Sequence, residues 1–400
     1  MRHGGNLRLF NLSRELLARG HTVYFAANAP ADPDLPARLE YLDDLKRKGF
    51  ISGHFALDYR QPRAVTRLAQ LVAYHPAILN RLLSRPRARA TRTVEEFIIR
   101  NHVDALIVSD RAFLFLIESL GTRLPVLVDW VDSFVLYFGR ALGMRLRHLK
   151  PRAFMADLRN LVIYYFQERY YGRRATVNFL ASPVDKRCLD AVTGRPEQNH
   201  SLLNGLSITP PRARVSKMAT RLIFTGNMDF APNYEAALWF IDEVLPLIHR
   251  RCPDITFTVA GRNPVPALLS RAGKGVEILG DVPDLSTEIA RGALYVAPMI
   301  SGSGFKNKVI ESIACGTFVV STSRGAEFLA PPLRECLLIA DSPSVFREQV
   351  LRFLNNPGHF NARLPALQNQ ISTEYTWSHR ADQLLGHLRR AAPAPPEPAG

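Results

Sequence analysis

The amino-acid sequence predicts an α/β protein made of two doubly wound domains, each with a parallel sheet covered by helices. Its 400 residues are too many for one ordinary core and suit two domains of about 150–200 residues. Hydrophobic residues make up 47% and charged residues 22% of the chain, which is a globular composition. Short, continuous apolar runs alternate with helical segments, and this alternation is typical of parallel sheets covered on both faces.

The first half of the chain opens with a helical pattern. Leu9, Leu12 and Leu16 recur at helical spacing, and Gly20 is a favourable residue just after the end of that helix. Apolar runs predict strands at residues 22–27, 104–109, 125–129 and 176–181. Basic segments of helical character lie among them, at residues 62–84, 86–101 and 140–174.

The start of this first domain departs from the usual pattern. A doubly wound domain normally begins with a strand, and a glycine turn then leads into the first helix. Here only three residues precede Gly4 and Gly5, so we expect the first strand of the N-terminal domain to be missing. Either the start is displaced or truncated, or the domain lacks its central strand. A missing strand leaves backbone groups unpaired, so we expect a weakened first domain.

The second half alternates more regularly. Its predicted strands are residues 221–225, 255–260, 276–279, 293–297, 317–320 and 336–340. Its predicted helices lie around residues 233–251, 264–272, 285–291, 306–314 and 325–330. A Pro-Pro-Arg linker after Gly205 separates a predicted N-terminal domain, residues 1–205, from a C-terminal domain, residues 206–375. Residues 391–400 are rich in alanine and proline, and we expect them to be disordered.

The net charge of +15 is concentrated in the first half of the chain. Residues 1–205 carry +12 and residues 206–400 carry +3. Such a field attracts nucleic acid, an anionic membrane or phosphorylated substrates. The chain has 43 arginines and only eight lysines, so a simple preference for surface arginine is an alternative explanation. The mixing of arginine with leucine, phenylalanine and tyrosine in residues 59–174 favours a surface that meets a membrane.

Several classes of protein are excluded by pattern. No window has the ~18 charge-free apolar residues of a membrane span, and no secretory signal opens the sequence. The four cysteines are scattered, which indicates neither a zinc site nor a disulfide framework, so we expect a cytoplasmic protein. Neither a P-loop nor a dinucleotide-binding glycine fingerprint occurs.

The most informative segment is residues 301–308, Ser-Gly-Ser-Gly-Phe-Lys-Asn-Lys, which we call the lysine loop. It follows a predicted strand and opens a predicted helix. Its small residues, Gly302, Ser303 and Gly304, let backbone N–H groups approach an anion, and a helix start adds partial positive charge. Lys306 and Lys308 add two full charges.

Glu311 lies about one helical turn after Lys308, so its carboxylate can accept hydrogen bonds from hydroxyl groups in the same place. An anion beside a hydroxyl-rich ring is what a nucleotide-sugar presents. The alternative is a Gly/Ser turn before a helix, with solvated lysines. The position after a parallel strand favours a ligand site, because ligands of open α/β sheets bind at the carboxyl ends of strands.

An ordered series of motifs resembles the donor-binding half of the retaining, group 1 glycosyltransferases. The series comprises FTGNMDFAPN at 224–233, VAGR at 259–262, GDVPD at 280–284, the lysine loop and GAE at 325–327. It is similar in particular to the subgroup associated with PEP-CTERM/exosortase and exopolysaccharide loci. The resemblance implies the GT-B architecture, in which two Rossmann-like domains face each other across a cleft. It also implies that a last helix, residues 376–390, crosses back to the N-terminal domain.

The resemblance assigns roles to individual residues. The backbone around Val282 would meet the nucleotide base, Glu311 the ribose, and Gly5 the donor phosphate from the other domain. Lysines would replace a metal at the diphosphate, so no metal and no other cofactor are expected. The implied donor-binding residues of the second domain are Gly226, Asn227, Arg262, Val282, Gly302, Ser303, Gly304, Phe305, Lys306, Lys308 and Glu311. The implied catalytic residues are Lys308, Glu311 and Asp129.

Three positions depart from the family pattern. Ser303 stands where many relatives have glutamate, Asn227 where many have arginine, and Asp129 where histidine is common. Asp129 and the nearby Asp132 fit either an acceptor base or a helix cap.

The sequence predicts a glycosyltransferase that moves a sugar, with retention, from a nucleotide-diphosphate-sugar to a glycan or lipid-linked acceptor in surface polysaccharide synthesis. We expect it to be cytoplasmic and peripheral to an anionic membrane surface, without a nucleic-acid partner. Two other interpretations stay open. One is a degenerate member that binds nucleotide or lipid without turnover. The other is a basic nucleic-acid-binding protein.

Overall fold

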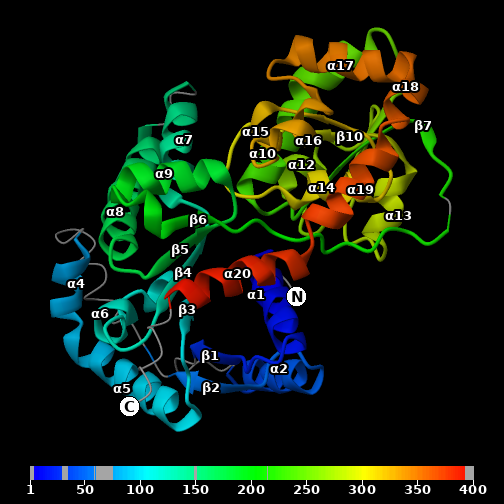
Figure 1. Cartoon of the computed structure of the whole chain (residues 1–400). Helices are drawn as coiled ribbons and strands as arrows, with labels where there is room; N and C mark the ends of the chain where they lie inside the picture. Colours follow the sequence, from blue (N-terminus) through cyan, green and yellow to red (C-terminus); the bar gives the residue numbers. More distant parts are fainter. Residues whose placement is uncertain are drawn as a thin grey trace. The chain divides into compact units, whose positions relative to one another are not determined.

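The computed structural model describes residues 4–28, 35–57, 59, 75–147, 151–213 and 215–391 (Figure 1). Internal contacts divide the chain into two units. Unit 1 contains residues 1–205 and 377–400, and unit 2 contains residues 206–376. Apart from Ala391, the tail expected to be disordered lies outside the described residues.

Unit 2 is built on one parallel sheet of six strands. The strands are β7 (Met218–Thr225), β8 (Thr256–Ala260), β9 (Val276–Leu279), β10 (Gly292–Ala297), β11 (Val319–Ser321) and β12 (Leu338–Ile339). Their order in the sheet is β12-β11-β10-β7-β8-β9. β7, β8 and β9 follow one another toward one edge of the sheet, and β10, β11 and β12 follow one another toward the opposite edge. This is the strand order of a doubly wound fold, with its switch point between β7 and β10.

The interior strands of unit 2 are apolar because helices pack over the sheet (Figure 1). All six residues of β10 are buried, as are the last five of β7. The covering helical segments are α10 (Ala231–Trp239), the π-helical η3 (Phe240–Val244), α11 (Leu245–His249), α12 (Pro266–Leu269), α13 (Leu285–Arg291), α14 (Asn307–Ala314), α15 (Ser323–Ala326), α16 (Pro331–Glu335), α17 (Pro343–Asn355), α18 (Pro357–Asn361) and α19 (Leu364–Glu374). The sequence interpretation named no helix at α17 or α19.

The described strands of unit 1 form two separate parallel sheets. The larger sheet has the order β3 (Leu106–Val108), β4 (Val126–Val131), β5 (Val177–Leu180) and β6 (Asn199–Ser201). The smaller sheet pairs β1 (Tyr24–Asn28) with β2 (Gly53–Leu57). The sequence interpretation named neither β2 nor β6.

The helical segments of unit 1 are α1 (Gly4–Ala18), α2 (Leu35–Arg47), α4 (Pro76–Leu82), α5 (Ser84–Asn101), η1 (Arg111–Phe113), α6 (Leu116–Leu120), α7 (Phe134–Arg147), α8 (Pro151–Gly172), α9 (Pro183–Thr193), η2 (Pro196–Gln198) and α20 (Trp377–Ala391). The basic segment predicted to be helical at 140–174 contains the end of α7 and the whole of α8. Residues 62–74 of the other predicted stretch lie outside the described residues.

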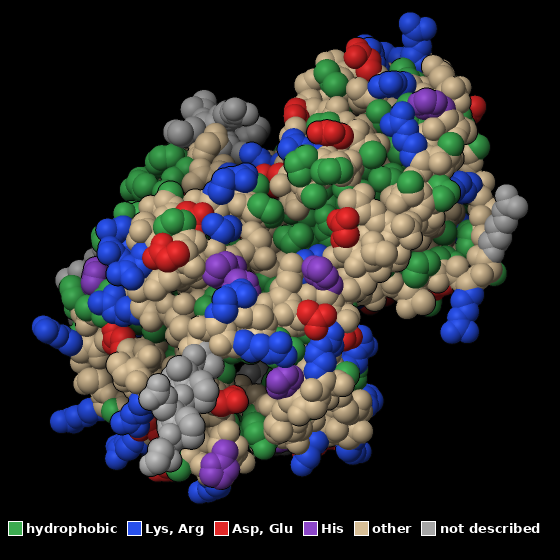
Figure 2. Space-filling model, in the orientation of Figure 1, with side chains coloured by type: hydrophobic (Ala, Val, Ile, Leu, Met, Phe, Trp, Pro, Cys, Tyr) green, Lys and Arg blue, Asp and Glu red, His purple; other side chains and the backbone are tan. Residues whose placement is uncertain are grey.

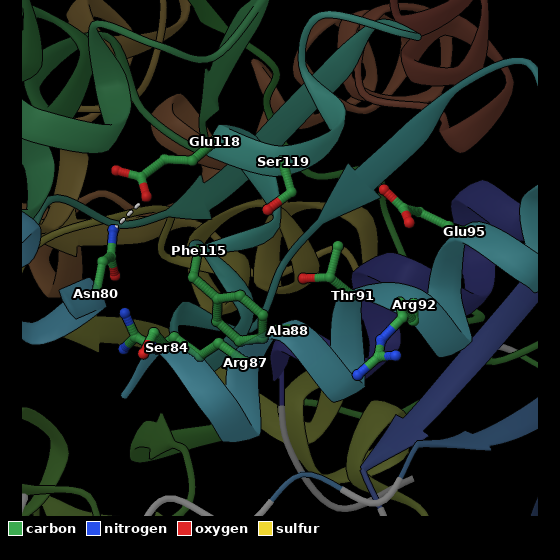
Figure 3. Close-up of a pocket in the computed structure, with 10 residues that line it drawn as sticks. All are labelled: Asn80, Ser84, Arg87, Ala88, Thr91, Arg92, Glu95, Phe115, Glu118 and Ser119. Atoms are coloured by element: carbon green, nitrogen blue, oxygen red, sulfur yellow. Dashed lines mark hydrogen bonds between the residues drawn. The ribbon is translucent and has the colours of Figure 1, made fainter. Parts of the chain in front are cut away.

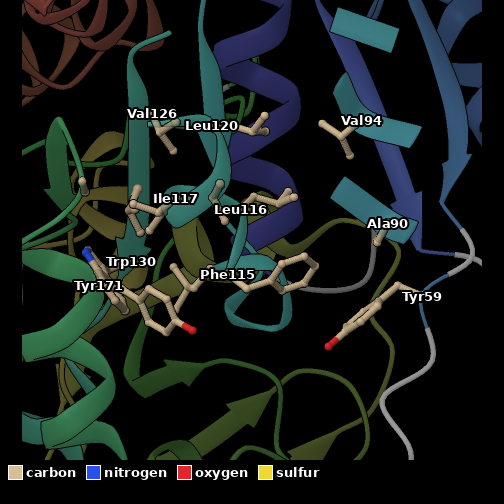
Figure 4. Packing of buried hydrophobic residues seen from close by; sticks show 14 of the residues in the cluster. Tyr59, Ala90, Val94, Phe115, Leu116, Ile117, Leu120, Val126, Trp130 and Tyr171 are labelled. Carbon is tan, nitrogen blue, oxygen red and sulfur yellow. The ribbon is translucent and has the colours of Figure 1, made fainter. Parts of the chain in front are cut away.

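A central cluster of buried side chains joins α5, α6, β4 and α8 in unit 1. It includes Val94, Phe115, Leu116, Trp130 and Tyr171, which converge in Figure 4. A second cluster packs α20 against α1, where Leu384 and Leu385 meet Leu12 and Leu16. The C-terminal helix therefore belongs to the core of unit 1. No helix among the described residues is both long and apolar enough to cross a lipid bilayer.

Candidate active site at the switch point of unit 2

The lysine loop lies at the carboxyl end of β10, next to the carboxyl end of β7. β7 ends at Thr225 and continues into Gly226, while β10 ends at Ala297 and continues through the lysine loop into α14. Because β7 and β10 are hydrogen-bonded neighbours, the two connections start side by side. Ligands of open α/β sheets bind at this place, where the strand order reverses.

Lys308 places a partly buried ammonium group at this switch point. Its Nζ donates a hydrogen bond to Oδ1 of Asn233 and lies 4.6 Å from the centre of the Phe224 ring. Burial, with the nearby charge of Lys306, lowers the pKa of Lys308 to about 7. Within the described residues, no carboxylate forms an ion pair with it. An anionic ligand bound beside this ammonium group would supply the negative charge to pair with it.

Lys306 adds a second cation at the start of the same helix. It is only 7% exposed, and its Nζ donates to the backbone oxygens of Ser303 and Gly304, the latter at 3.1 Å. Lys306 is the residue that caps α14, and no side chain caps the first N–H groups of the helix there. Two cations at the positive end of a helix are unfavourable unless an anion lies between them.

Glu311 projects from the next turn of α14. Burial raises the pKa of its carboxyl group to about 7, against the opposing effect of the Lys308 charge. A carboxylate with this position can accept hydrogen bonds from hydroxyl groups of a ligand held at Lys308.

Glycines allow the connections after β7 and β8 to approach each other closely. Gly261, which follows β8, has φ +152°, and a Cβ at this residue would lie 1.7 Å from the backbone oxygen of Gly226. A Cβ on Gly226 would in turn lie 3.3 Å from Nζ of Lys308. The floor of the site therefore tolerates no side chain at Gly261.

We expect Gly261→Ala to destabilise unit 2 by more than about 4 kcal/mol, because an overlap with backbone cannot be relieved by side-chain rotation. Gly280→Ala is the matched control, since nothing lies within 4 Å of its Cβ position. Thermal unfolding followed by circular dichroism compares the two variants. Equal unfolding temperatures would contradict the close approach of Gly261 and Gly226.

Comparison with known families identifies this unit. The family model "Glycosyl transferases group 1" matches residues 219–356. These residues are a group 1 glycosyltransferase domain. A protein of the Klebsiella pneumoniae cps region, described as an uncharacterized 44.6 kDa protein, is 27% identical over 144 residues. That match spans 34% of this chain and only 37% of the relative.

Solved structures extend the similarity in fold to both units. HepE from Anabaena, crystallised with UDP, is 15% identical with a TM-score of 0.64, over 98% of this chain and 97% of its own. Sucrose-phosphate synthase from Thermosynechococcus elongatus is 15% identical with a TM-score of 0.65, over 97% and 93% of the two chains. The predicted α/β fold of GT-B type is thereby confirmed.

The remaining predicted residues of the glycosyltransferase domain follow the same edge of its sheet. Asn227 comes after β7, Arg262 after β8 and Val282 after β9. The side chain of Arg262 is 43% exposed and lies 3.9 Å from a carboxylate oxygen of Asp281. Phe305 differs from these residues, because its ring packs on Phe328, 4.2 Å away between centres, and anchors the lysine loop.

Two predicted site residues, Asp129 and Gly5, belong to unit 1. Asp129 lies in β4, is 3% exposed, and accepts hydrogen bonds from Nε and Nη2 of Arg8 at 2.7 and 3.1 Å. Gly5 lies in the first turn of α1. The ion pair with Arg8 gives Asp129 a structural role. The catalytic role of Asp129 and the phosphate contact of Gly5 stay predictions.

The sequence interpretation assigned no role to two polar residues that organise the glycosyltransferase domain. Asn233 binds Lys308 and also donates from Nδ2 to the backbone oxygen of Asn227 at 2.9 Å. Glu235 accepts a hydrogen bond of 2.8 Å from Ser301 at the start of the lysine loop. Asn233 ends the FTGNMDFAPN motif, so the motif itself was the available signal.

Unit 1 has a separate polar pocket of about 470 Å³ between α5 and α6 (Figure 3). Arg87 lies over the Phe115 ring, 5.1 Å from its centre, and Asn80 donates to Glu118 at 2.6 Å. Both signs of charge line this pocket, so it does not favour a polyanion.

Proposed function

We propose that this chain transfers a sugar, with retention, from a nucleotide-diphosphate-sugar to a glycan or lipid-linked acceptor. The observation that carries the proposal is the desolvated Lys308 ammonium beside Lys306 at the start of α14. Both charges lie where a doubly wound sheet binds phosphate groups. HepE was crystallised with UDP-glucose, so this donor is the first to test.

Each residue of the site would have a distinct task. Lys306, Lys308 and the first N–H groups of α14 would neutralise the diphosphate, and Glu311 would accept hydrogen bonds from the ribose. When the bond between the sugar and the diphosphate breaks, negative charge develops on the departing nucleoside diphosphate. Fixed positive charge near that oxygen lowers the activation barrier of transfer, because the charged groups are already in place and need not reorient during the reaction.

We propose that the lysines make a metal unnecessary. The described residues contain no group of three or more His, Cys, Asp or Glu side chains placed to hold a metal ion. The proposal is tested by turnover in the presence of EDTA. Loss of activity with EDTA, and its return on adding Mg²⁺ or Mn²⁺, would contradict it.

We expect UDP-glucose to bind more weakly as pH rises from 6 to 8.5. In the empty site the pKa of Lys308 is about 7, so above pH 7 the ligand must restore a proton to the amine. Glu311, with its pKa raised to about 7, ionises over the same range, but the ribose hydroxyls favour its charged form, so Glu311 does not add to this loss. Calorimetric titration should show up to about tenfold weaker binding per pH unit above 7, with proton uptake. A constant affinity would contradict this assignment.

The deciding experiment is a donor screen by hydrolysis and by thermal protection, using UDP- and GDP-sugars. Protection with turnover supports the glycosyltransferase. Protection by nucleotide-sugar without turnover, with acceptor present, would favour a degenerate binding protein. Protection by RNA alone would favour a nucleic-acid-binding protein.

We also propose that unit 1 contacts an anionic membrane, where a lipid-linked acceptor would be met. Helix α5 carries Arg85, Arg87, Arg89, Arg92 and Arg100. Figure 2 shows blue side chains scattered over the visible face of unit 1, many of them along its rim, with red side chains among them. Each basic residue near anionic lipid contributes about 1 kcal/mol. Flotation with phosphatidylglycerol vesicles, but not with phosphatidylcholine vesicles, is the expected result.

The cps-region relative makes surface polysaccharide the first acceptor class to test.

A further inference from the structure

The start of α10 holds the lysine loop at both of its ends. Where the loop begins, Oε2 of Glu235 accepts a hydrogen bond of 2.8 Å from the Ser301 hydroxyl. Where the loop ends, Oδ1 of Asn233 accepts a hydrogen bond from Nζ of Lys308. Both acceptors come from one helix, so α10 sets the position of the loop and of its second lysine.

The amide of Asn233 has one orientation that satisfies its neighbours. The residue is 8% exposed, and its Nδ2 donates to the backbone oxygen of Asn227 at 2.9 Å. A backbone oxygen can only accept hydrogen bonds, so the NH₂ group of the amide must face Asn227. The amide oxygen is therefore directed to Nζ of Lys308.

The Lys308 ammonium has room for a further partner. It carries three N–H donors. Within the described part of the chain, the only oxygen that accepts from it is Oδ1 of Asn233. Its other neighbours are Sδ of Met299 at 3.8 Å and the Phe224 ring, whose centre lies 4.6 Å away. Sulfur and aromatic faces are weak acceptors, so oxygens of a bound anion would be better partners for the remaining N–H groups.

We propose that Asn233 is a positioning residue for sugar transfer, whose neutral amide orients the Lys308 ammonium and leaves its positive charge for the donor diphosphate. This inference rests on the proposed function. An aspartate would occupy the same space but would form an ion pair with Lys308, and the diphosphate would have to compete with that carboxylate. The second oxygen of the aspartate would also face the backbone oxygen of Asn227, where neither group can donate.

The surroundings of Lys308 allow the role of Asn233 to be measured. Burial and the charge of Lys306 lower the pKa of Lys308, and the charge of Glu311 opposes them. From α10, Glu235 bonds to the other end of the lysine loop, and Asn233 is the neutral acceptor. A hydrogen bond to the charged form of an amine favours that form. Loss of the acceptor should therefore lower the pKa of Lys308, and a carboxylate in its place should raise the pKa.

The test is the pH titration of Lys308 in the full chain, followed by NMR with lysine labelled at the ε-carbon. The chain has eight lysines, and the signal that disappears in Lys308→Met is the one to follow. Asn233→Asp should move the titration midpoint up by about one pH unit or more, and Asn233→Ala should move it down. Asn355→Asp adds the same charge at an exposed position of unit 2 and should leave the midpoint unchanged.

Inorganic pyrophosphate is the ligand probe, titrated calorimetrically at pH 6. The Asn233→Asp protein should bind it at least about tenfold more weakly than the unsubstituted protein, because a carboxylate then neutralises Lys308 and faces the anion. The Asn355→Asp protein should bind pyrophosphate with unchanged affinity.

Two results would overturn the inference. One is a titration midpoint that stays unchanged in either variant of Asn233 or moves in the same direction in both, because a purely structural asparagine does not control the titration of the amine. The other is undiminished pyrophosphate binding by folded Asn233→Asp. If Asn233→Asp does not fold, Asn233→Ala decides, since its midpoint must fall. The proposed function fails separately, if the unsubstituted protein binds neither pyrophosphate nor UDP-glucose, whereas the titration of Lys308 needs no ligand.

Discussion

Lys308→Met should lower sugar transfer by about 100- to 1,000-fold, the effect of removing one fixed charge-stabilising donor from an active site. Methionine retains the length and the apolar part of the lysine side chain but carries no charge. The cation that faces the departing diphosphate is therefore lost. The measurement is kcat/KM for transfer from the donor found in the screen, together with the thermal shift that this donor produces.

The same substitution should leave the empty protein as stable as before, or make it more stable. Burial lowers the pKa of Lys308 to about 7, which shows that the folded site holds the charged form at a cost. Lys274→Met is the control, because this lysine lies exposed in the same unit. Full activity in Lys308→Met, or an equal loss in Lys274→Met, would remove Lys308 from the site.

Arg8→Met should destabilise unit 1 by about 3–5 kcal/mol, the usual effect of leaving one partner of a buried ion pair alone. Arg8 is 1% exposed and pairs with Asp129 at 2.7 Å. It also donates to the backbone oxygen of Leu202 at 2.7 Å and to Oδ1 of Asn204 at 2.8 Å. One guanidinium thus fixes α1, β4 and the segment after β6. Urea unfolding of unit 1 is the measurement.

Variants of Asp129 separate structure from catalysis. The double variant Arg8→Met/Asp129→Leu removes both charges and should recover much of the lost stability. If Asp129→Asn keeps most of its stability and some transfer activity, the carboxylate is structural. If it is stable and inactive, the catalytic role of Asp129 is supported, and the purely structural interpretation fails.

Local sequence patterns predicted the strand, loop and helix that form the candidate site better than the side-chain contacts within it. A buried strand, a Gly/Ser loop and an amphipathic helix follow one another within residues 292–314, so each could be inferred from its neighbours. The partners of that segment could not be inferred in this way. Asn233 meets Lys308 across 75 residues, and Glu235 meets Ser301 across 66 residues. Desolvation of Lys308 depends on this tertiary packing.

The same limit applies in unit 1. β6 reads Asn-His-Ser, which has no strand propensity, and exists because it pairs with β5 and because the Asn178 side chain donates to Asn199 at 2.9 Å. The sequence left Asp129 as either an acceptor base or a helix cap, because its partner Arg8 lies 121 residues away.

The contrast between the single sheet of unit 2 and the divided sheets of unit 1 affects how any melting curve is interpreted. A two-stranded sheet adds little cooperativity, so unit 1 should lose its structure at a lower temperature than unit 2. A calorimetric scan would then contain two heat-absorption peaks instead of one. Ligand screening on this protein should follow the upper peak, because a nucleotide held by unit 2 raises the melting temperature of that unit. A dye-based melting curve dominated by the unfolding of unit 1 would fail to detect binding of the ligand to unit 2.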